Sequence, residues 1–129
     1  MAKTASELSG EELHSYRPWL SMERHRKDPE VSRRREEAWK VARVAAEMLK
    51  KRFKATRVVV FGSLARKTVF TRWSDIDLAV WGIAPEEYYR AAGSAMDIGL
   101  ESGIRIDLVD AGESGPQLLA EIEQEGIRL

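Results

Sequence analysis

The chain has 129 residues, enough for one domain with a core of its own, and its 21 basic and 21 acidic side chains leave no net charge. Its 43% apolar and 33% charged residues are typical of a globular protein in water, and no apolar run has the length of a membrane span or of a signal-peptide core. The absence of cysteine excludes disulfides and thiolate metal sites, so we expect a cytoplasmic protein.

The neutral total hides a charge asymmetry. Residues 1–57 carry 15 Lys and Arg against 9 Asp and Glu, a net charge of +6, whereas residues 58–129 carry 6 against 12, a net charge of −6. A basic front half can bind nucleic acid or an acidic partner. In the basic run 24–35, no aromatic side chain other than His25 is available to stack on a base. Nucleic-acid binding is therefore weakly indicated, and a solvated helix face is the favoured interpretation.

The first 54 residues are expected to be helical. Ser9 with Glu12 resembles a capping box that opens a short helix, which Pro18 interrupts or ends. A second helix starts at Asp28 and Pro29, an N-cap aspartate followed by proline in the first turn. Apolar residues then recur at the spacing of one long amphipathic helix: Ala38, Val41, Ala42, Ala45, Met48, Leu49 and Phe53.

Three strands and a helix follow. Residues 57–61 are apolar and β-branched, with Gly62 ending the strand, and residues 75–81 form the second strand. Pro85 opens a helix whose apolar residues recur at helical spacing until two glycines loosen or end it. A third strand is expected at residues 104–109, and since a full helix separates it from the second, the two should be parallel with a right-handed crossover.

The C-terminal segment repeats a helix signal. Ser114 with Gln117 resembles a capping box, and the helix that follows should run through Glu125 and close at Gly126. The strands are too apolar for a sheet that is covered on one face only. We therefore expect an α/β fold with a small mixed β-sheet and flanking helices, in which an N-terminal helical extension (1–54) packs on the remaining domain (55–129).

The end of the first strand has the features of an anion site. Gly62 permits close approach of the backbone, the Ser63 hydroxyl can bond a phosphate oxygen, and residues 64–66 can start a helix whose N-terminus favours anions. The spacing is not that of a Walker A loop. Taken alone the pair is weak, because Gly-Ser commonly just ends a strand.

Two aspartates interrupt the second strand. Asp75 and Asp77 are two residues apart, so their carboxylates share one face and repel each other unless a cation lies between them. Such a pair suits Mg²⁺ ions that also hold the phosphates of a nucleotide. The alternative is that Asp75 caps a turn and Asp77 forms a salt bridge.

A third acid repeats the anomaly. Asp107 lies on the face of its strand opposite Ile106 and Leu108, where a parallel neighbour could bring it beside Asp77. Asp110 is the competing acid, but it falls at the strand end on the other face and suits a turn. Three acids that converge on an apolar sheet favour a metal site.

Together these residues resemble a known family. "FGSLARKTVFTRWSDIDLAV" matches the G-S-x-A-R-G … S-D-I-D-L pattern of polymerase-β-like nucleotidyltransferases, and more narrowly of the minimal nucleotidyltransferase (MNT) proteins encoded beside HEPN-domain partners. "IRIDLVDAGE" and "EQEGIRL" extend the similarity nearly to the C-terminus. The resemblance identifies residues 55–129 as the nucleotidyltransferase domain.

The resemblance also implies roles for individual residues. Gly62 and Ser63 would hold the β- and γ-phosphates, and Asp75 and Asp77 would bind two Mg²⁺ ions. Asp107 would be the third acid, which helps to bind the catalytic metal and activates the attacking hydroxyl. Arg66 matches the motif arginine and is a nucleotide-binding candidate whose role is either loop packing or phosphate contact.

The activity implied is transfer of AMP from ATP to a hydroxyl acceptor. The resemblance implies a tyrosine of a HEPN-type RNase toxin, so the chain would be the antitoxin, since neither terminal helical region suggests a small-molecule pocket. Alternatives are adenylylation of a small molecule or an RNA end, or a non-catalytic antitoxin that only binds.

Some residues depart from the pattern or lie outside it. Lys67 stands where the family has glycine, and the apolar segment 68–73 before Ser74 suggests packing or partner contact. Trp19 and Trp39 are either partner anchors or packing residues of the N-terminal helices. His14 and His25 are expected at the surface.

Overall fold

A four-stranded mixed sheet forms the centre of the computed structural model, which describes residues 28–66 and 69–129. The strands are β1 (Arg57–Phe61), β2 (Ile76–Trp81), β3 (Ile106–Asp110) and β4 (Ile127–Arg128), in the order β3-β2-β1-β4. β1 is antiparallel to β2 and β4, whereas β2 and β3 are parallel. The mixed sheet and the parallel pair joined by a helix are confirmed.

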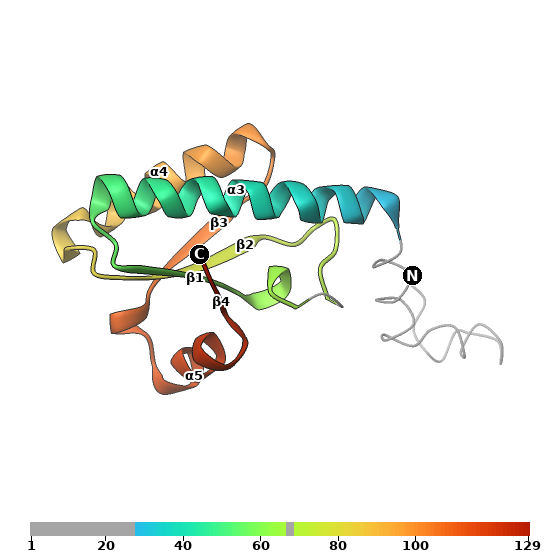
Figure 1. Cartoon of the computed structure of the whole chain (residues 1–129). Coiled ribbons are helices and arrows are strands. Elements are labelled where there is room, and N and C mark those ends of the chain that lie inside the picture. The colour runs from blue at the N-terminus through green and yellow to red at the C-terminus, as the bar shows by residue number, and fades with distance from the viewer. Residues whose placement is uncertain (1–27, 67–68) are drawn as a thin grey trace, which may run out of the picture.

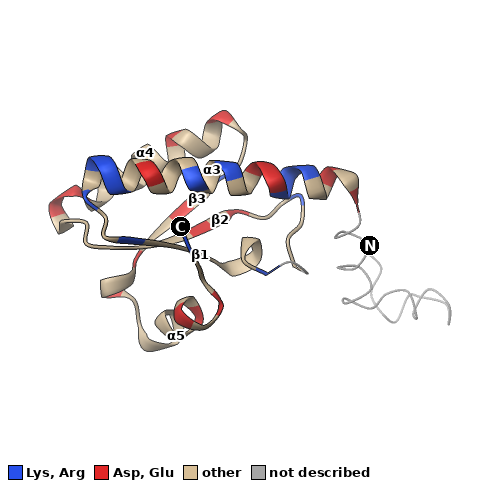
Figure 2. Cartoon of the chain, in the orientation of Figure 1, with Lys and Arg blue, Asp and Glu red and all other residues tan. Residues whose placement is uncertain are grey.

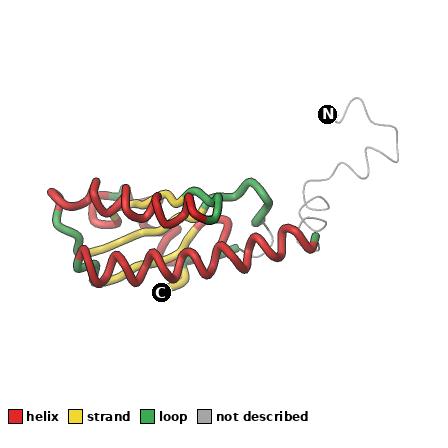
Figure 3. The backbone as a smooth tube through the Cα atoms, turned by 90° about the horizontal axis from the view of Figure 1, so that it is seen from above, coloured by secondary structure: helices red, strands yellow, loops and turns green. Residues whose placement is uncertain are grey.

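Helices cover both faces of this sheet. α3 (Pro29–Phe53) crosses one face, and α5 (Pro116–Glu125) lies on the other (Figure 1). Seen from above, α4 (Tyr88–Glu101) lies beside α3 on the same face (Figure 3). The α3 and α4 side holds the larger core, and the α5 side holds a smaller one that includes Val59, Ala79 and Ile122.

Helix α3 forms for the local reasons that its sequence indicates. The Asp28 carboxylate accepts a hydrogen bond from the Glu30 N–H at 2.8 Å, and Pro29 occupies the first turn. Lys54 ends the helix in the left-handed conformation with φ of 66°. Basic and acidic residues alternate along its outer face (Figure 2), which supports the solvated-face interpretation for this helix. Trp39 packs against the larger core beneath Arg35.

Alternation along β2 decides which face receives each side chain. Ile76, Leu78 and Val80 are buried in the core under α3 and α4. The residues between them therefore face α5, as Ala79 does in the smaller core. Asp77 lies on this α5 face of the sheet.

Several boundaries differ from those expected. β2 starts at Ile76, one residue late, and β3 covers Ile106–Asp110 because Ile104 bonds back to Gly99 at the end of α4. A short 3₁₀ turn (Pro85–Glu87) precedes α4. β4 was not predicted, because a two-residue strand has no periodicity and forms only by pairing with β1.

The predicted capping box at the C-terminal helix is wrong. The N-cap of α5 is Gly115, which has no side chain to accept a bond, and the Ser114 hydroxyl instead donates to the Asp110 carbonyl at 3.0 Å. The helix ends at Glu125 as expected. The predicted capping box at Ser9 and Glu12 lies outside the described residues, with these others: Pro18, Trp19, His14, His25 and Lys67.

Helix α3 packs on the face made by β1 and β2, and its buried residues share one core with them. The division of the chain at residue 54 stays a prediction. None of the helices in the described residues is both long and apolar enough to span a membrane.

Candidate active site

Strand register brings two of the predicted acids together. Asp77 is paired with Phe61 of β1 on one side and with Asp107 of β3 on the other. Residues paired across a sheet point to the same face, so the carboxylates of Asp77 and Asp107 are neighbours on the α5 face. Figure 2 shows acidic residues on the adjoining strands β2 and β3. The predicted convergence of Asp77 and Asp107 is confirmed.

The charges around Asp77 are mutually unfavourable. Burial, as the largest cause, and then the negative charges of Asp107, Asp75 and Glu121 together raise the pKa of Asp77 to about 6. An aspartate left in this environment at neutral pH is ionised at a free-energy cost. A bound cation would relieve that cost.

Gly62 lies directly against Asp77. Its φ is +72°, a left-handed conformation that glycine adopts without strain. A Cβ at this position would lie 2.3 Å from the Asp77 Oδ2 atom. The sequence suggested that glycine leaves room for phosphate, and the structure adds that it leaves room for the Asp77 carboxylate.

The turn that follows Gly62 is held in place from within the core. Gly62–Leu64 form one 3₁₀ turn, in which the Ala65 N–H donates to the Gly62 carbonyl at 3.1 Å. The Leu64 side chain is fully buried, and an Arg35 guanidinium N–H from α3 donates to the Leu64 carbonyl at 3.1 Å. Ser63, on the same turn, is only partly buried.

Arg66, at the end of this segment, reaches across to α5. Its Nε donates to Glu125 Oε1 at 2.7 Å, and its terminal nitrogen forms ion pairs with Glu125 and, at 3.6 Å, with Glu121. These contacts raise the pKa of the Arg66 guanidinium, with the Glu125 hydrogen bond as the largest cause.

Sequence reasoning missed Glu121 and Glu125. They are four residues apart, so both point to one side of α5, where two like charges destabilise a helix unless a cation lies near. That spacing in the sequence indicates that a cation lies near the two glutamates, although it does not identify Arg66 as that cation.

The other acids of β3 differ in surroundings. The Asp107 Oδ1 atom accepts a hydrogen bond from Arg105 Nε at 3.0 Å, a pair largely open to solvent. Asp110 is the last residue of β3 and points to the opposite face, and its Oδ1 atom accepts a bond from the Gly112 N–H at 3.1 Å. The prediction that Asp110 serves a turn is confirmed.

The donor set suits magnesium. Mg²⁺ prefers oxygen ligands and is typically held by one or two carboxylates together with water and substrate phosphates. In the described part of the chain, no three acidic or histidine side chains are already arranged as a metal centre. The neighbouring carboxylates of Asp77 and Asp107, with the charge of Asp75 near them and the partly buried Gly62 turn beside them, fit an ion that arrives with a nucleotide.

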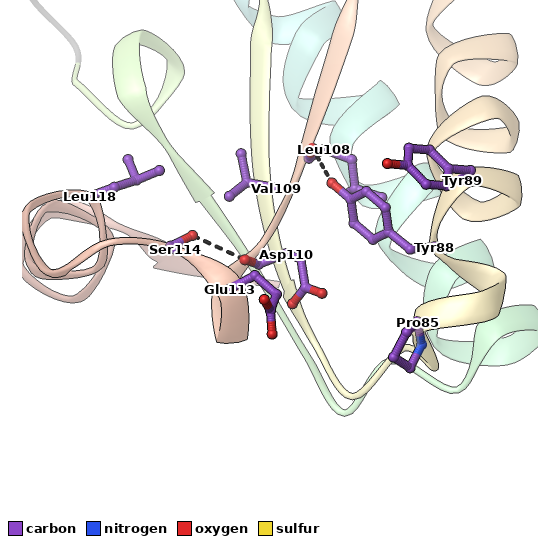
Figure 4. Close-up of a pocket in the computed structure, with 9 residues that line it drawn as sticks. All are labelled: Pro85, Tyr88, Tyr89, Leu108, Val109, Asp110, Glu113, Ser114 and Leu118. Atoms are coloured by element: carbon purple, nitrogen blue, oxygen red, sulfur yellow. Dashed lines mark hydrogen bonds between the residues drawn. The ribbon is translucent and has the colours of Figure 1, made fainter.

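A separate hollow of about 700 Å³ is lined by residues 108–110 at the C-terminal end of β3 and by residues of the neighbouring segments (Figure 4). Tyr88 and Tyr89 of α4 line one side, and Ser114 and Leu118 line the other. The Tyr88 hydroxyl donates to the Leu108 carbonyl, and burial raises the pKa of Tyr88. Apolar walls of this kind were not expected from the sequence.

The apolar segment before Ser74 divides into two environments. Phe70 is buried with 2% of its surface exposed, so it packs into the larger core. Trp73 has 82% of its surface exposed and contributes no packing. Arg72 pairs with Asp28 at 3.3 Å, which ties this loop to the start of α3.

Comparison with known proteins gives a consistent result. The family model described as "Polymerase beta, Nucleotidyltransferase" matches residues 45–129. A solved structure described as a minimal nucleotidyltransferase is 30% identical, with 76% of this chain and 91% of that chain covered and a TM-score of 0.50. No curated protein matches the sequence.

Two more distant solved structures share the fold. A toxin–antitoxin crystallised with AMP-PNP is 22% identical over 65% of this chain and 68% of that chain, with a TM-score of 0.52. The MntA–HepT toxin–antitoxin is 18% identical over 68% of each chain, with a TM-score of 0.50.

Proposed function

The chain belongs to the polymerase-β nucleotidyltransferase family, and from this premise we propose that it transfers AMP from ATP to a tyrosine of a HEPN-type RNase toxin. One observation carries the proposal: the carboxylates of Asp77 and Asp107 are neighbours on one face of the sheet beside Gly62, and their repulsion, with that of the nearby Asp75, contributes to the raised pKa of Asp77. A protein that acted only by binding would gain nothing from such a cluster.

The residues divide the work as follows. The turn of Gly62 and Ser63 would bind the β- and γ-phosphates through its backbone and hydroxyl. Asp75, Asp77 and Asp107 would hold Mg²⁺, which supplies neutralisation of the charge that develops on the phosphates. These assignments come from the family resemblance, and the pairing of Asp77 with Asp107 supports them.

In the reaction, the acceptor hydroxyl oxygen bonds to the α-phosphorus of ATP as the bond from that phosphorus to the bridging oxygen breaks. Pyrophosphate leaves with the electron pair. The hydroxyl proton passes to the Asp107 carboxylate, which lies beside Asp77 and is partly open to solvent. The products are an adenylylated acceptor and pyrophosphate.

A protein acceptor is supported by relatives. A toxin–antitoxin of the same fold was crystallised with AMP-PNP, and MntA was crystallised with HepT. The net charge of −6 over residues 58–129 opposes an RNA backbone near the site.

A small-molecule acceptor is the second candidate, because the hollow at β3 has the size and the apolar walls of a ligand pocket. This observation weakens the expectation that the chain lacks such a pocket. Asp110 and Glu113 at its edge would favour a cationic ligand.

The test offers labelled ATP and Mg²⁺ with three acceptors in parallel: the product of the neighbouring gene, total tRNA, and a panel of cationic small molecules. AMP on a tyrosine of the neighbouring protein, lost in Asp75→Asn and retained in the control Asp97→Asn on the exposed face of α4, supports the proposal. Label confined to tRNA or to a small molecule would assign the other acceptor. Equal neutralisation of the toxin by wild type and Asp75→Asn, without label, would establish a binding antitoxin.

A further inference from the structure

Arg66 matches a motif position that could contact phosphate, yet its guanidinium binds two glutamates of α5. Both its Nε and a terminal nitrogen bond to Glu125, and the terminal nitrogen also pairs with Glu121. All three side chains are between one third and one half exposed, so solvent screens the ion pairs and each one contributes little to stability. Their effect on position therefore matters more than their effect on stability.

The two glutamates need this arginine. Placed four residues apart on α5, they repel each other, and Arg66 is the cation that the structure places against both. Glu121 also acts on the pKa of Asp77, so this part of α5 lies near the carboxylates of the site. Arg66 thus joins the glycine turn to the helix that borders the acids.

The backbone of Arg66 closes the same turn. Its N–H is shared between the Gly62 and Ser63 carbonyls, each at 3.2 Å. From the opposite face, Arg35 holds the Leu64 carbonyl. The turn is therefore held from both sides of the sheet.

We propose that Arg66 is a positioning residue, which ties the Gly62–Leu64 turn to α5 through Glu125 and Glu121 and holds the turn ready for phosphate without contacting the phosphate itself. This inference rests on the proposed nucleotide site and assigns its motif arginine a structural partner. It makes α5 a part of the site that the acids alone do not reveal.

Glu125→Gln separates the two roles by the sign of its effect. A positioning Arg66 loses the negative charge of its main partner and keeps only a neutral, weaker acceptor, so AMP-PNP with Mg²⁺ should bind roughly ten- to a hundredfold more weakly, as expected for a displaced binding group. An Arg66 that contacts phosphate would be released by the same change, and binding would stay constant or strengthen. Either of those results would overturn the proposal.

Exchange of the charges tests the pair directly. Arg66→Glu should lose AMP-PNP binding, and adding Glu125→Arg should restore most of it, since the new arginine would lie four residues after Glu121 and could reach the new glutamate. Failure of the double variant to regain binding would show that phosphate needs an arginine at position 66. The matched control is Glu123→Gln, which removes a 2.8 Å bridge from Arg57 to the same helix and should leave binding unchanged.

A readout without nucleotide keeps this inference distinct from the proposed function. Hydrogen exchange at the Ala65 and Arg66 amides reports the closure of the turn. In Glu125→Gln these amides should exchange about tenfold faster or more, with no change in Glu123→Gln. Unchanged exchange would overturn the inference, whereas faster exchange in a protein that binds no nucleotide would refute only the proposed function.

Discussion

Asp77→Asn should stabilise the fold while it removes the function. The substitution keeps the shape of the side chain and removes one charge from the group formed by Asp75, Asp77 and Asp107. Because the folded protein without metal bears the cost of ionising Asp77 at neutral pH, removing that charge should raise the free energy of unfolding.

The magnitude follows from the raised pKa. When an aspartate with an ordinary pKa of about 4 has a pKa of about 6 in the folded state, its ionisation lowers the free energy of unfolding by up to about 3 kcal/mol. Asp77 is only partly buried, so solvent screens part of the repulsion and we expect a gain of about 1–2 kcal/mol. For a domain of this size, that gain raises Tm by about 4–8 °C.

The pH dependence has a definite sign. The folded protein binds the Asp77 proton more tightly than the unfolded chain does. The loss of stability from ionising Asp77 is therefore absent below about pH 4, grows as the pH rises, and reaches its full size above about pH 6. Wild type and Asp77→Asn should therefore differ in Tm at about pH 7.5 and converge at about pH 4.

Thermal melting with and without ligand is the assay. AMP-PNP with Mg²⁺ should raise the Tm of the wild type and leave that of Asp77→Asn unchanged, since binding to the folded state alone stabilises it. The control is Asp97→Asn, an exposed change on α4, which should behave as wild type. A Tm for Asp77→Asn at or below that of wild type at about pH 7.5, or an equal difference at both pH values, would refute the electrostatic argument.

Two further predictions concern the same site. Gly62→Ala should weaken Mg²⁺-ATP binding about tenfold or more and lower Tm, because its Cβ would lie 2.3 Å from Asp77 Oδ2 in a left-handed conformation; calorimetry with normal affinity would contradict this. The control Gly93→Ala, in open space on α4, should add about 0.5–1 kcal/mol of stability and leave affinity intact. Mg²⁺-ATP affinity should also rise between about pH 5 and 7 as Asp77 loses its proton, and a flat calorimetric profile would contradict metal binding there.

Local signals in the sequence determined most of the elements. The Asp28 cap and the spacing of apolar residues placed α3, and runs of apolar and β-branched residues placed β1 and β2 to within one residue. Asp77 and Asp107 stood out as acids because each interrupts an otherwise apolar strand. These features are readable because each depends on neighbours within a few positions along the chain.

Only the tertiary structure decided which residues meet. The sequence indicated that Asp107 could lie beside Asp77, and the register shows that the two are paired. The partnership of Arg66 with Glu125 and the hollow beside Tyr88 were not predicted, and each joins segments that are distant along the chain. The short strand β4 exists only because β1 offers it hydrogen-bonding partners. Such contacts depend on how helices and strands pack, and packing has no periodicity within a single segment from which it could be predicted.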